Sequence, residues 1–321
     1  MSRHESAVDY ACHAAPGCTK EGVAGVQALA GGENHDVFKV SYADGNGDAQ
    51  HVVIRVATTK RARDPHVAAR EAAVLTAVAG VAAPVLYDFR LTSAWFDAPV
   101  MCTSFVAGEQ RSPDSEQDYE LLGRAVARLH ALPTHDLADV LPSPGTHDAY
   151  LTERRTTITG RARAVIPRLP AVVGTRLGQV LVHVEAVTAP TGVSSRSDPP
   201  VLLHGDPAGG NLIWAPEPVL IDWEYARLGD PADEVAYVFV QHQCTTAQRT
   251  AFWRGYAREL PGGGTLADLQ ERTTVWEPLT LLGSTVWWCD AWVAQDGKAG
   301  SHHRDAALAR LHQLEALVLA T

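Results

Sequence analysis

Three polar side chains stand at spacings that suit the transfer of a phosphoryl group. Asn211 comes five residues after Asp206, and Asp222 comes eleven residues after Asn211. The apolar runs 201–204 and 219–222 predict two short strands, whose ends would present these groups at one rim. One carboxylate there can accept a proton from a hydroxyl or orient it, while the amide and the other carboxylate hold Mg²⁺ against the phosphates of ATP. Hard oxygen ligands suit Mg²⁺, which keeps water and phosphate oxygens as its other ligands.

The segments before residue 108 predict a mostly antiparallel sheet with one long helix. Strands are predicted where the sequence alternates with period two or is β-branched, at 37–42, 51–56, 84–89 and 99–105. The turn at 44–48 is rich in Asp and Gly and joins the first two strands as a hairpin. Apolar residues at helical spacing follow Pro65 and predict the helix. Residues 1–20 show little periodicity and predict a frayed lead or a short helix.

The rest of the chain predicts helices, apart from the two short strands around Asp206. Helices are predicted at 119–132, 150–166, 174–188 and over most of the chain after Pro231. The segment 189–200 is rich in Pro, Ser, Gly and Thr and predicts a surface loop. The chain therefore divides near residue 108 into a sheet-containing part and a helical part, so the expected fold class is α+β.

Length and charge exclude several classes of protein. The chain has 321 residues, which suggests two domains, and its net charge of -10 argues against a nucleic-acid binder or a partner of anionic membranes. No apolar run is long enough to span a membrane, and the first residues are too polar for a signal peptide. The five cysteines are scattered and indicate reduced thiols, so a cytoplasmic location is expected.

Two other catalytic classes lack their motifs. The sequence contains no G-x-S-x-G, the nucleophile turn of α/β-hydrolases, and no G-x-x-x-x-G-K-[ST], the phosphate loop of P-loop kinases. Both absences count against these two classes, and the leading hypothesis is direct in-line transfer from ATP without a covalent enzyme intermediate. Positioning and charge stabilisation would supply most of the rate of such a reaction.

The sequence H-G-D-x-x-x-x-N at 204–211, followed by I-D-W-E at 221–224, resembles the aminoglycoside phosphotransferase and choline kinase family of small-molecule kinases. The resemblance extends over most of the chain, and order, spacing and strand context agree. It implies a protein-kinase-like two-lobe fold. Residues 1–107 would form an N-terminal nucleotide-binding lobe with an antiparallel sheet and one long helix. Residues 108–321 would form a mostly helical C-terminal lobe for catalysis and acceptor binding.

By this resemblance, ATP and Mg²⁺ are the expected cofactors, and each residue of the motif gains a role. Asp206 is the expected catalytic base or hydroxyl-orienting group. His204 would fix the catalytic loop through hydrogen bonding and would not take the proton itself. Asn211 and Asp222 are the expected magnesium ligands.

The resemblance also assigns a phosphate-binding cation to the strand 51–56. Arg55 stands where the family has Lys or Arg, and it would contact the phosphates and pair with Glu71 of the following helix. Arg is always charged and its fork suits phosphate, so lysine is not obligatory there. Lysine is scarce in this chain, with four among 27 basic residues. Lys39 and Lys60 are the alternatives.

Two further nucleotide contacts are expected through the backbone. The glycine-containing turn with Gly32 and Asn34 would cradle phosphates through its N–H groups, and a plain hairpin is the alternative. Ser104 and Val106 lie in the expected hinge, where backbone groups would pair with the edge of the adenine. The hinge demands no particular side chain.

The expected acceptor site combines carboxylates with tryptophans. Its candidates are Glu224, Asp230, Glu277, Trp288, Asp290 and Trp292. Trp288 and Trp292 share one helical face, and an aromatic wall beside carboxylates would attract a cationic acceptor through cation–π contact and charge. The structural alternatives are that Asp230 caps a helix and that the tryptophans pack in the core.

The leading hypothesis is a kinase that phosphorylates a hydroxyl of a small, cationic molecule. An aminoglycoside-type antibiotic and a choline- or ethanolamine-like metabolite are equally open as acceptors. The alternative is a catalytically silent, nucleotide-binding kinase-like protein, although all three residues of the phosphoryl-transfer motif are present. No nucleic acid or membrane partner is expected, and the protein would be a monomer or a homodimer.

Overall fold

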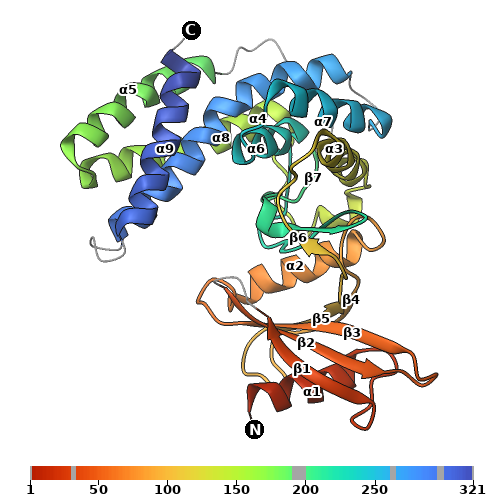
Figure 1. Ribbon diagram of the computed structural model, residues 1–321. Helices are drawn as coiled ribbons and strands as arrows, with labels where there is room; N and C mark the ends of the chain where they lie inside the picture. The colour runs from red at the N-terminus through yellow and green to blue at the C-terminus, as the bar shows by residue number, and fades with distance from the viewer. Residues whose placement is uncertain (1, 30–33, 190–199, 261–264, 295–299, 320–321) are drawn as a thin grey trace.

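The computed structural model describes residues 2–29, 34–189, 200–260, 265–294 and 300–319. It has two lobes, and the sheet of the N-terminal lobe lies below a larger, mostly helical lobe in Figure 1. This arrangement confirms the predicted α+β class with an antiparallel sheet in the first lobe and helices in the second. Within the described part of the chain, no helix is both long and apolar enough to cross a membrane.

The N-terminal lobe is a five-stranded antiparallel sheet between two helices. The strand order is β1-β2-β3-β5-β4, with bounds Val23–Leu29, His35–Ala43, Ala49–Ala57, Val100–Ser104 and Leu86–Arg90. Helix α1 (Arg3–Ala14) covers the face that is turned away from the C-terminal lobe, and α2 (Pro65–Ala77) lies between the sheet and that lobe (Figure 1).

The alternation of β3 decides which face of the sheet carries charge. Val52, Ile54 and Val56 are buried in one apolar cluster with Tyr10 of α1. Because successive side chains of a strand point to opposite faces, Arg55 emerges on the α2 side. The sequence of β3 therefore places the guanidinium of Arg55 at the cleft between the lobes.

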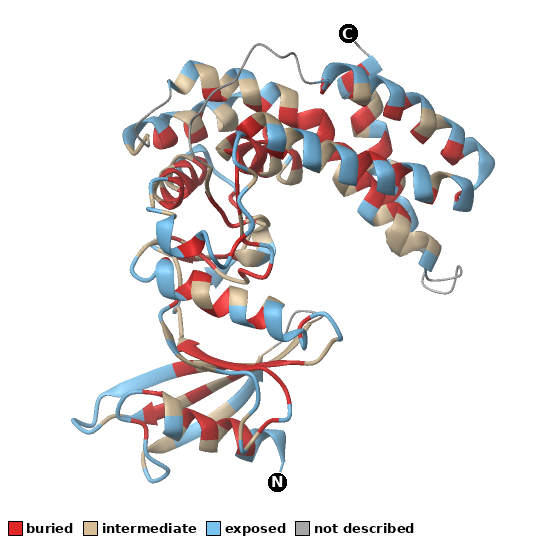
Figure 2. Cartoon of the chain, turned by 180° about the vertical axis from the view of Figure 1, so that it is seen from behind, coloured by how far each residue is buried: buried red, intermediate tan, exposed pale blue. Residues whose placement is uncertain are grey.

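The C-terminal lobe is built from helices around a few short strands. Its helices are α3 (Glu116–His130), α4 (His147–Val165), α5 (Ala171–Val187), α6 (Pro231–Gln241), α7 (Thr246–Arg258), α8 (Leu266–Ala294) and α9 (Gly300–Leu319). Its strands are β6 (Glu109–Gln110), β7 (Val201–Leu203), β8 (Leu212–Ala215), β9 (Glu217–Leu220) and β10 (Arg227–Gly229). Buried residues, red in Figure 2, lie along these helices, and one apolar cluster joins the helices to β7, β8 and β9. One core thus supports the loops that leave β7 and β9.

Helices α3 and α7 pack against each other at a glycine. A Cβ built on Gly255 of α7 would lie 1.9 Å from the carbonyl oxygen of Glu120 in α3. Such a distance is far below van der Waals contact, so any side chain at this position would force the two helices apart. Glycine is required here by the close approach of the two backbones.

Several elements differ from the predictions. The first residues form a full helix that begins with a capping box, in which Ser2 Oγ accepts from Glu5 N at 3.2 Å and Ser2 N donates to Glu5 Oε2 at 2.7 Å. Of the two expectations for residues 1–20, a frayed lead or a short helix, the structure has the helix, so the N-terminal lobe carries it in addition to the one long helix predicted after Pro65. Strands β6, β8 and β10 were not predicted, because runs of two to four residues show no clear period.

Candidate active site

A loop between β7 and β8 carries the motif at 204–211, and His204 anchors its start. His204 is fully buried, packs edge-on against Trp223 with ring centroids 4.5 Å apart, and donates from Nε2 to Ile221 O at 3.0 Å. Its Nδ1 accepts from the backbone N–H of Asp206 at 3.3 Å. Burial lowers the pKa of His204, which favours the neutral ring that these two hydrogen bonds require. The geometry agrees with a loop-fixing role for this histidine.

Gly205 makes the tight turn that follows. Its φ of +86° lies in the left-handed region, and a Cβ there would stand 2.3 Å from Tyr225 O. Its N–H donates to Glu234 Oε1 at 2.7 Å, and Glu234 Oε2 accepts from buried His130 at 3.0 Å. The turn is thus tied to α6 and α3, which hold the next residue of the loop in place.

Asp206 is held by two hydrogen bonds of different kinds. Its Oδ1 accepts from the hydroxyl of Tyr237 in α6, and its Oδ2 accepts from Asn211 Nδ2 at 2.9 Å. Burial raises the pKa of Asp206, although the hydrogen bonds from Tyr237 and Asn211 oppose that rise. Because Nδ2 of Asn211 is committed to Asp206, the amide oxygen is the atom that remains for a cation.

A charged network crosses from the sheet to the C-terminal lobe. Arg55 Nη1 donates to Glu71 Oε1 at 2.5 Å and Nη2 donates to Asp222 Oδ1 at 2.8 Å. We call these three residues the Arg55 triad. Burial opposes the charge of Arg55, but Glu71 and Asp222 outweigh it and raise its pKa. The predicted pairing of Arg55 with Glu71 is present, and Asp222 joins it with a positive φ of 66°.

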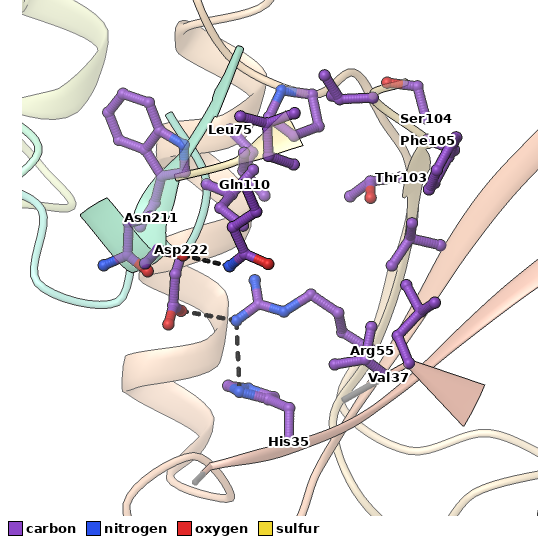
Figure 3. A pocket seen from close by; sticks show the side chains of 18 of the residues that line it. His35, Val37, Arg55, Leu75, Thr103, Ser104, Phe105, Gln110, Asn211 and Asp222 are labelled. Carbon is purple, nitrogen blue, oxygen red and sulfur yellow. Dashed lines mark hydrogen bonds and ion pairs between the residues drawn. The ribbon is translucent and has the colours of Figure 1, made fainter. Parts of the chain in front are cut away.

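His35 completes this network from β2. Its Nδ1 lies 3.3 Å from Arg55 Nη2 and accepts a hydrogen bond, as Figure 3 shows. Burial, together with the nearby charge of Arg55, lowers the pKa of His35 to about 4. A neutral imidazole therefore faces the guanidinium and leaves its positive charge to the two carboxylates.

The first of two large cavities lies between the lobes. It has a volume of about 380 Å³, and the side chains around it come from the sheet, α2 and the motif loop (Figure 3). Its lining includes Asn34, His35, Val37, Arg55, Leu75, Thr103, Ser104, Phe105, Val106, Gln110, Asn211 and Asp222. The cavity thus brings the expected hinge, the phosphate-binding cation and both expected metal ligands to one space.

The protein offers few metal ligands in this cavity. In the parts of the chain that the structure describes, no group of three or more His, Cys, Asp or Glu side chains gathers where it could hold a metal ion. Asn211 and Asp222 offer an amide oxygen and a carboxylate, which are hard ligands. This donor set fits Mg²⁺, whose coordination would be completed by phosphate oxygens and water.

The N-terminal turn is tied to the C-terminal lobe by one amide. Gly32 lies outside the described residues, but Asn34 Nδ2 donates to Glu224 Oε1 at 3.0 Å and to Oε2 at 3.2 Å. Burial and then the charge of Asp222 raise the pKa of Glu224. Its carboxylate holds the turn and does not line the second large cavity, so the acceptor role of Glu224 stays a prediction that this placement does not favour.

The second large cavity opens on the other side of Asp206 and has a volume of about 400 Å³. Helices α4, α6 and α8 surround it. Its lining includes Arg154, Thr157, Arg161, Gly205, Asp206, Tyr225, Arg227, Asp233, Tyr237, Gln241, Thr280, Ser284, Trp287 and Trp288. Asp206 belongs to this cavity and Asn211 to the first one, so their 2.9 Å hydrogen bond joins the two spaces.

The predicted carboxylates of the acceptor wall are engaged elsewhere. Asp230 is buried, caps α6 by accepting from Ala232 N at 3.0 Å, and also accepts from Trp276 Nε1 at 3.2 Å. Glu277 is buried and accepts from Arg249 at 2.5 and 2.9 Å. Neither residue lines the second cavity, so their acceptor role stays a prediction that this placement does not favour, whereas the capping alternative holds for Asp230.

The aromatic part of that wall is partly in place. Trp288 lines the second cavity, as predicted, and Trp287, which was not predicted, lies beside it. Trp292 is half-buried and packs against the core of the lobe, away from the cavity lining, which agrees with its structural alternative. Asp290 is no free carboxylate, because it accepts from Arg161 at 3.0 Å and pairs with Arg168 at 3.6 Å.

Some residues of the site carried no recognisable signal in the sequence. Tyr237 hydrogen-bonds Asp206 from α6, and Arg154 and Arg161 line the second cavity from α4. Each lies in an ordinary helical pattern without a motif. Only the packing of distant helices brings them to the motif loop, so their contribution could not be read from local spacing.

The fold and the site together define a class. An antiparallel sheet packs against a helical lobe, and Arg55 of the sheet pairs with buried Glu71 at the cleft between them. Asp206, Asn211 and Asp222 lie at the same cleft. This is the arrangement of a kinase-like phosphotransferase. The chain belongs to the phosphotransferase enzyme family, whose model matches residues 25–272. The comparison with curated proteins gave no significant sequence match.

Solved structures share the fold over nearly the whole chain. A choline/ethanolamine kinase family protein from Mesorhizobium loti is 20% identical with a TM-score of 0.63, covering 98% of this chain and 95% of that one. A choline kinase from Cryptosporidium parvum is 13% identical with a TM-score of 0.68, covering 98% and 94%. Spectinomycin phosphotransferase in complex with ADP and spectinomycin is 11% identical with a TM-score of 0.62, covering 97% and 93%. These likenesses confirm the predicted kinase-like fold.

Proposed function

We propose that the protein transfers the γ-phosphoryl group of ATP to a hydroxyl of a small molecule. The observation that carries the proposal is the placement of Asp206 between two cavities. Arg55, Asn211 and Asp222 line the first cavity, and Asp206 lines the second beside α4 and α8. A phosphate donor and an acceptor need such adjoining spaces with one carboxylate between them.

The first cavity suits a nucleotide. Its apolar lining from Val37, Leu75 and the segment 103–106 would receive the adenine, while Arg55 would meet the phosphates with a charged fork. The related spectinomycin phosphotransferase structure contains ADP, which supports the assignment of a nucleotide to this fold. Asn211 and Asp222 would hold Mg²⁺, which when bound neutralises phosphate charge.

Asp206 would act on the acceptor. Its carboxylate is fixed by Tyr237 and Asn211, and its raised pKa makes it a better proton acceptor than an exposed aspartate. It would orient the acceptor hydroxyl and accept its proton as the oxygen forms the new bond to phosphorus. His204, with both ring nitrogens engaged, would hold the loop and take no proton.

The test is an acceptor screen followed by one substitution. The full chain is incubated with ATP, Mg²⁺ and a panel of hydroxylated antibiotics and metabolites, and products carrying an added phosphate group are sought by mass spectrometry. For the acceptor found, Asp206→Asn should lower kcat by about 10²- to 10⁴-fold while ATP still binds. Asp305→Asn, an exposed aspartate of α9, is the matched control and should keep wild-type kcat.

Two results would contradict the proposal. Full activity of the Asp206→Asn variant would remove this residue from the reaction. Tight binding of ATP without phosphorylation of any acceptor in a broad panel would favour the alternative of a catalytically silent nucleotide-binding protein.

A further inference from the structure

We infer that the acceptor carries an anionic group besides its hydroxyl, and that Arg154 and Arg161 recognise this group in the second cavity. The inference rests on the proposed function, because it takes the second cavity as the acceptor site. It departs from the cationic acceptor expected from the sequence.

The first observation is the charge of the lining. Three arginines and two aspartates line the cavity, but the charges of Arg227 and Asp233 neutralise each other. Asp233 is buried and accepts from Arg227 Nη2 at 2.7 Å and from the hydroxyl of Tyr150 at 2.5 Å. What remains on the lining is Asp206, the carboxylate of the proposed reaction, and the two arginines of α4, of which Arg161 is paired with Asp290 at the rim.

The second observation is the state of Arg154. Its Nε lies 3.7 Å from Asp233 Oδ2, so this nitrogen faces a carboxylate at ion-pair distance without making a hydrogen bond to it. Its Nε is buried and has no hydrogen-bond partner within the described residues, and the same holds for Oγ1 of Thr280 on the facing helix α8. Buried polar atoms normally have partners, so two orphaned ones on lining residues indicate that a polar ligand completes this cavity.

The third observation is the spacing along α4. Arg154, Thr157, Ile158 and Arg161 all line the cavity, and their spacing of three, four and seven residues puts them on one helical face. Two turns, or about 10 Å, separate the two arginines along the helix axis. Arg154 lies toward the ion pair of Arg227 beside Asp206, while Arg161 lies toward the rim at Asp290.

The rim is also positive. Asp290 accepts from Arg161 at 3.0 Å and lies 3.6 Å from Arg168, so one carboxylate is shared by two cations. Asp230 and Glu277, which would have attracted a cationic group, are bound in the core of the lobe. An ammonium in this cavity would therefore meet like charge at both ends of the α4 face, whereas a carboxylate or phosphate would meet the forked donors that suit it.

The experiment compares four hexoses that share one ring. Glucuronate and glucose 6-phosphate are the anionic probes, glucose is neutral and glucosamine is cationic. Equilibrium binding of each to the full chain, saturated with MgADP, is measured by calorimetry. At least one anionic probe should bind about tenfold or more tightly than glucosamine, as expected for a charge-assisted hydrogen bond to an anion. Its identity distinguishes a carboxylate from a phosphate.

Arg154→Gln should remove this preference, and Arg161→Gln should reduce it. Arg163→Gln is the matched control on the same helix, because Arg163 pairs with Glu185 and does not line the cavity. The control should keep the wild-type preference. Thermal unfolding of all three variants checks that each is folded.

Several outcomes would overturn the inference. They are tighter binding of glucosamine, equal or absent binding of all four probes, and an anion preference that Arg154→Gln leaves intact. Each of these leaves the proposed function standing if MgADP binds and an acceptor is phosphorylated. Failure of MgADP to bind would overturn the proposed function itself.

Discussion

Replacing Arg55 with methionine should destabilise the fold and weaken nucleotide binding by two separable routes. The side chain of Glu71 is 2% exposed, and its carboxylate depends on Arg55 for charge compensation. Asp222 is 34% exposed and can be hydrated when Arg55 is removed. We therefore assign the loss to Glu71 and expect Arg55→Met to lower the free energy of unfolding by about 3–5 kcal/mol, the cost of an uncompensated buried charge.

A second substitution separates stability from binding. Glu71→Gln in the Arg55→Met background removes the stranded charge and keeps an oxygen for the backbone N–H of Trp223, which lies 3.3 Å from Glu71 Oε1. The double variant should return to within about 1 kcal/mol of the wild type, because removing both charges of a buried pair is often nearly neutral. Its MgATP affinity should stay at least about tenfold below that of the wild type, because the phosphate-binding fork is absent.

Urea unfolding followed by tryptophan fluorescence gives the stabilities, and calorimetry gives the MgATP affinities. Arg304→Met is the control, since Arg304 is half-exposed and pairs with Asp305 on the surface, and it should change stability by less than about 0.5 kcal/mol. An Arg55→Met variant as stable as the wild type would refute the dependence of Glu71 on Arg55. Recovery of MgATP affinity in the double variant would refute the phosphate-binding role of Arg55.

Two further predictions concern stability. Gly255→Ala should lower the free energy of unfolding in urea by about 1–3 kcal/mol, because the new Cβ would stand 1.9 Å from an α3 carbonyl oxygen. Gly178→Ala in α5 is the control, and it should raise the free energy of unfolding by about 0.5–1 kcal/mol because the space around its Cβ is open. Equal effects of the two substitutions would contradict the role of helix packing at Gly255. The pKa of His35 is about 4 in the folded protein, beside the Arg55 triad, and 6.5 in the unfolded chain, so folding favours the neutral ring. The stability that this preference gives is fully present above pH 6.5 and is lost as the pH falls toward 4. The loss should approach about 3 kcal/mol, because each tenfold change in proton affinity corresponds to about 1.4 kcal/mol. In the His35→Gln variant, the free energy of unfolding should vary less with pH over this range. A pH profile in that variant equal to that of the wild type would contradict the burial of a neutral imidazole.

The meeting of the charged side chains between the lobes was predictable because its signals are local. The spacing of Asp206, Asn211 and Asp222 is fixed by two strands and their connecting loop, so it survives in the sequence as a motif. Arg55 stands in an unmistakable strand, and Glu71 follows in the next helix. Short separations and regular elements let the sequence reveal which side chains meet.

The lining of the second cavity was not predictable to the same degree, because long-range pairing decides which charges are free. Asp230 and Glu277 look available in the sequence, yet Arg272 and Arg249 from other helices neutralise them. Trp288 and Trp292, one turn apart, both pack against the core, but of the two only Trp288 also lines the second cavity. Helix periodicity alone could not tell these two tryptophans apart, since the cavity ends between them.

The most direct test of the account is a crystal structure of the protein with Mg²⁺ and a non-hydrolysable ATP analogue. The account predicts the adenine against residues 103–106, the metal within about 2.1 Å of oxygens of Asn211 and Asp222, and the γ-phosphate on the side of Asp206. Binding of the analogue in the second cavity, or a metal that touches neither Asn211 nor Asp222, would contradict the assignment of the two cavities to donor and acceptor.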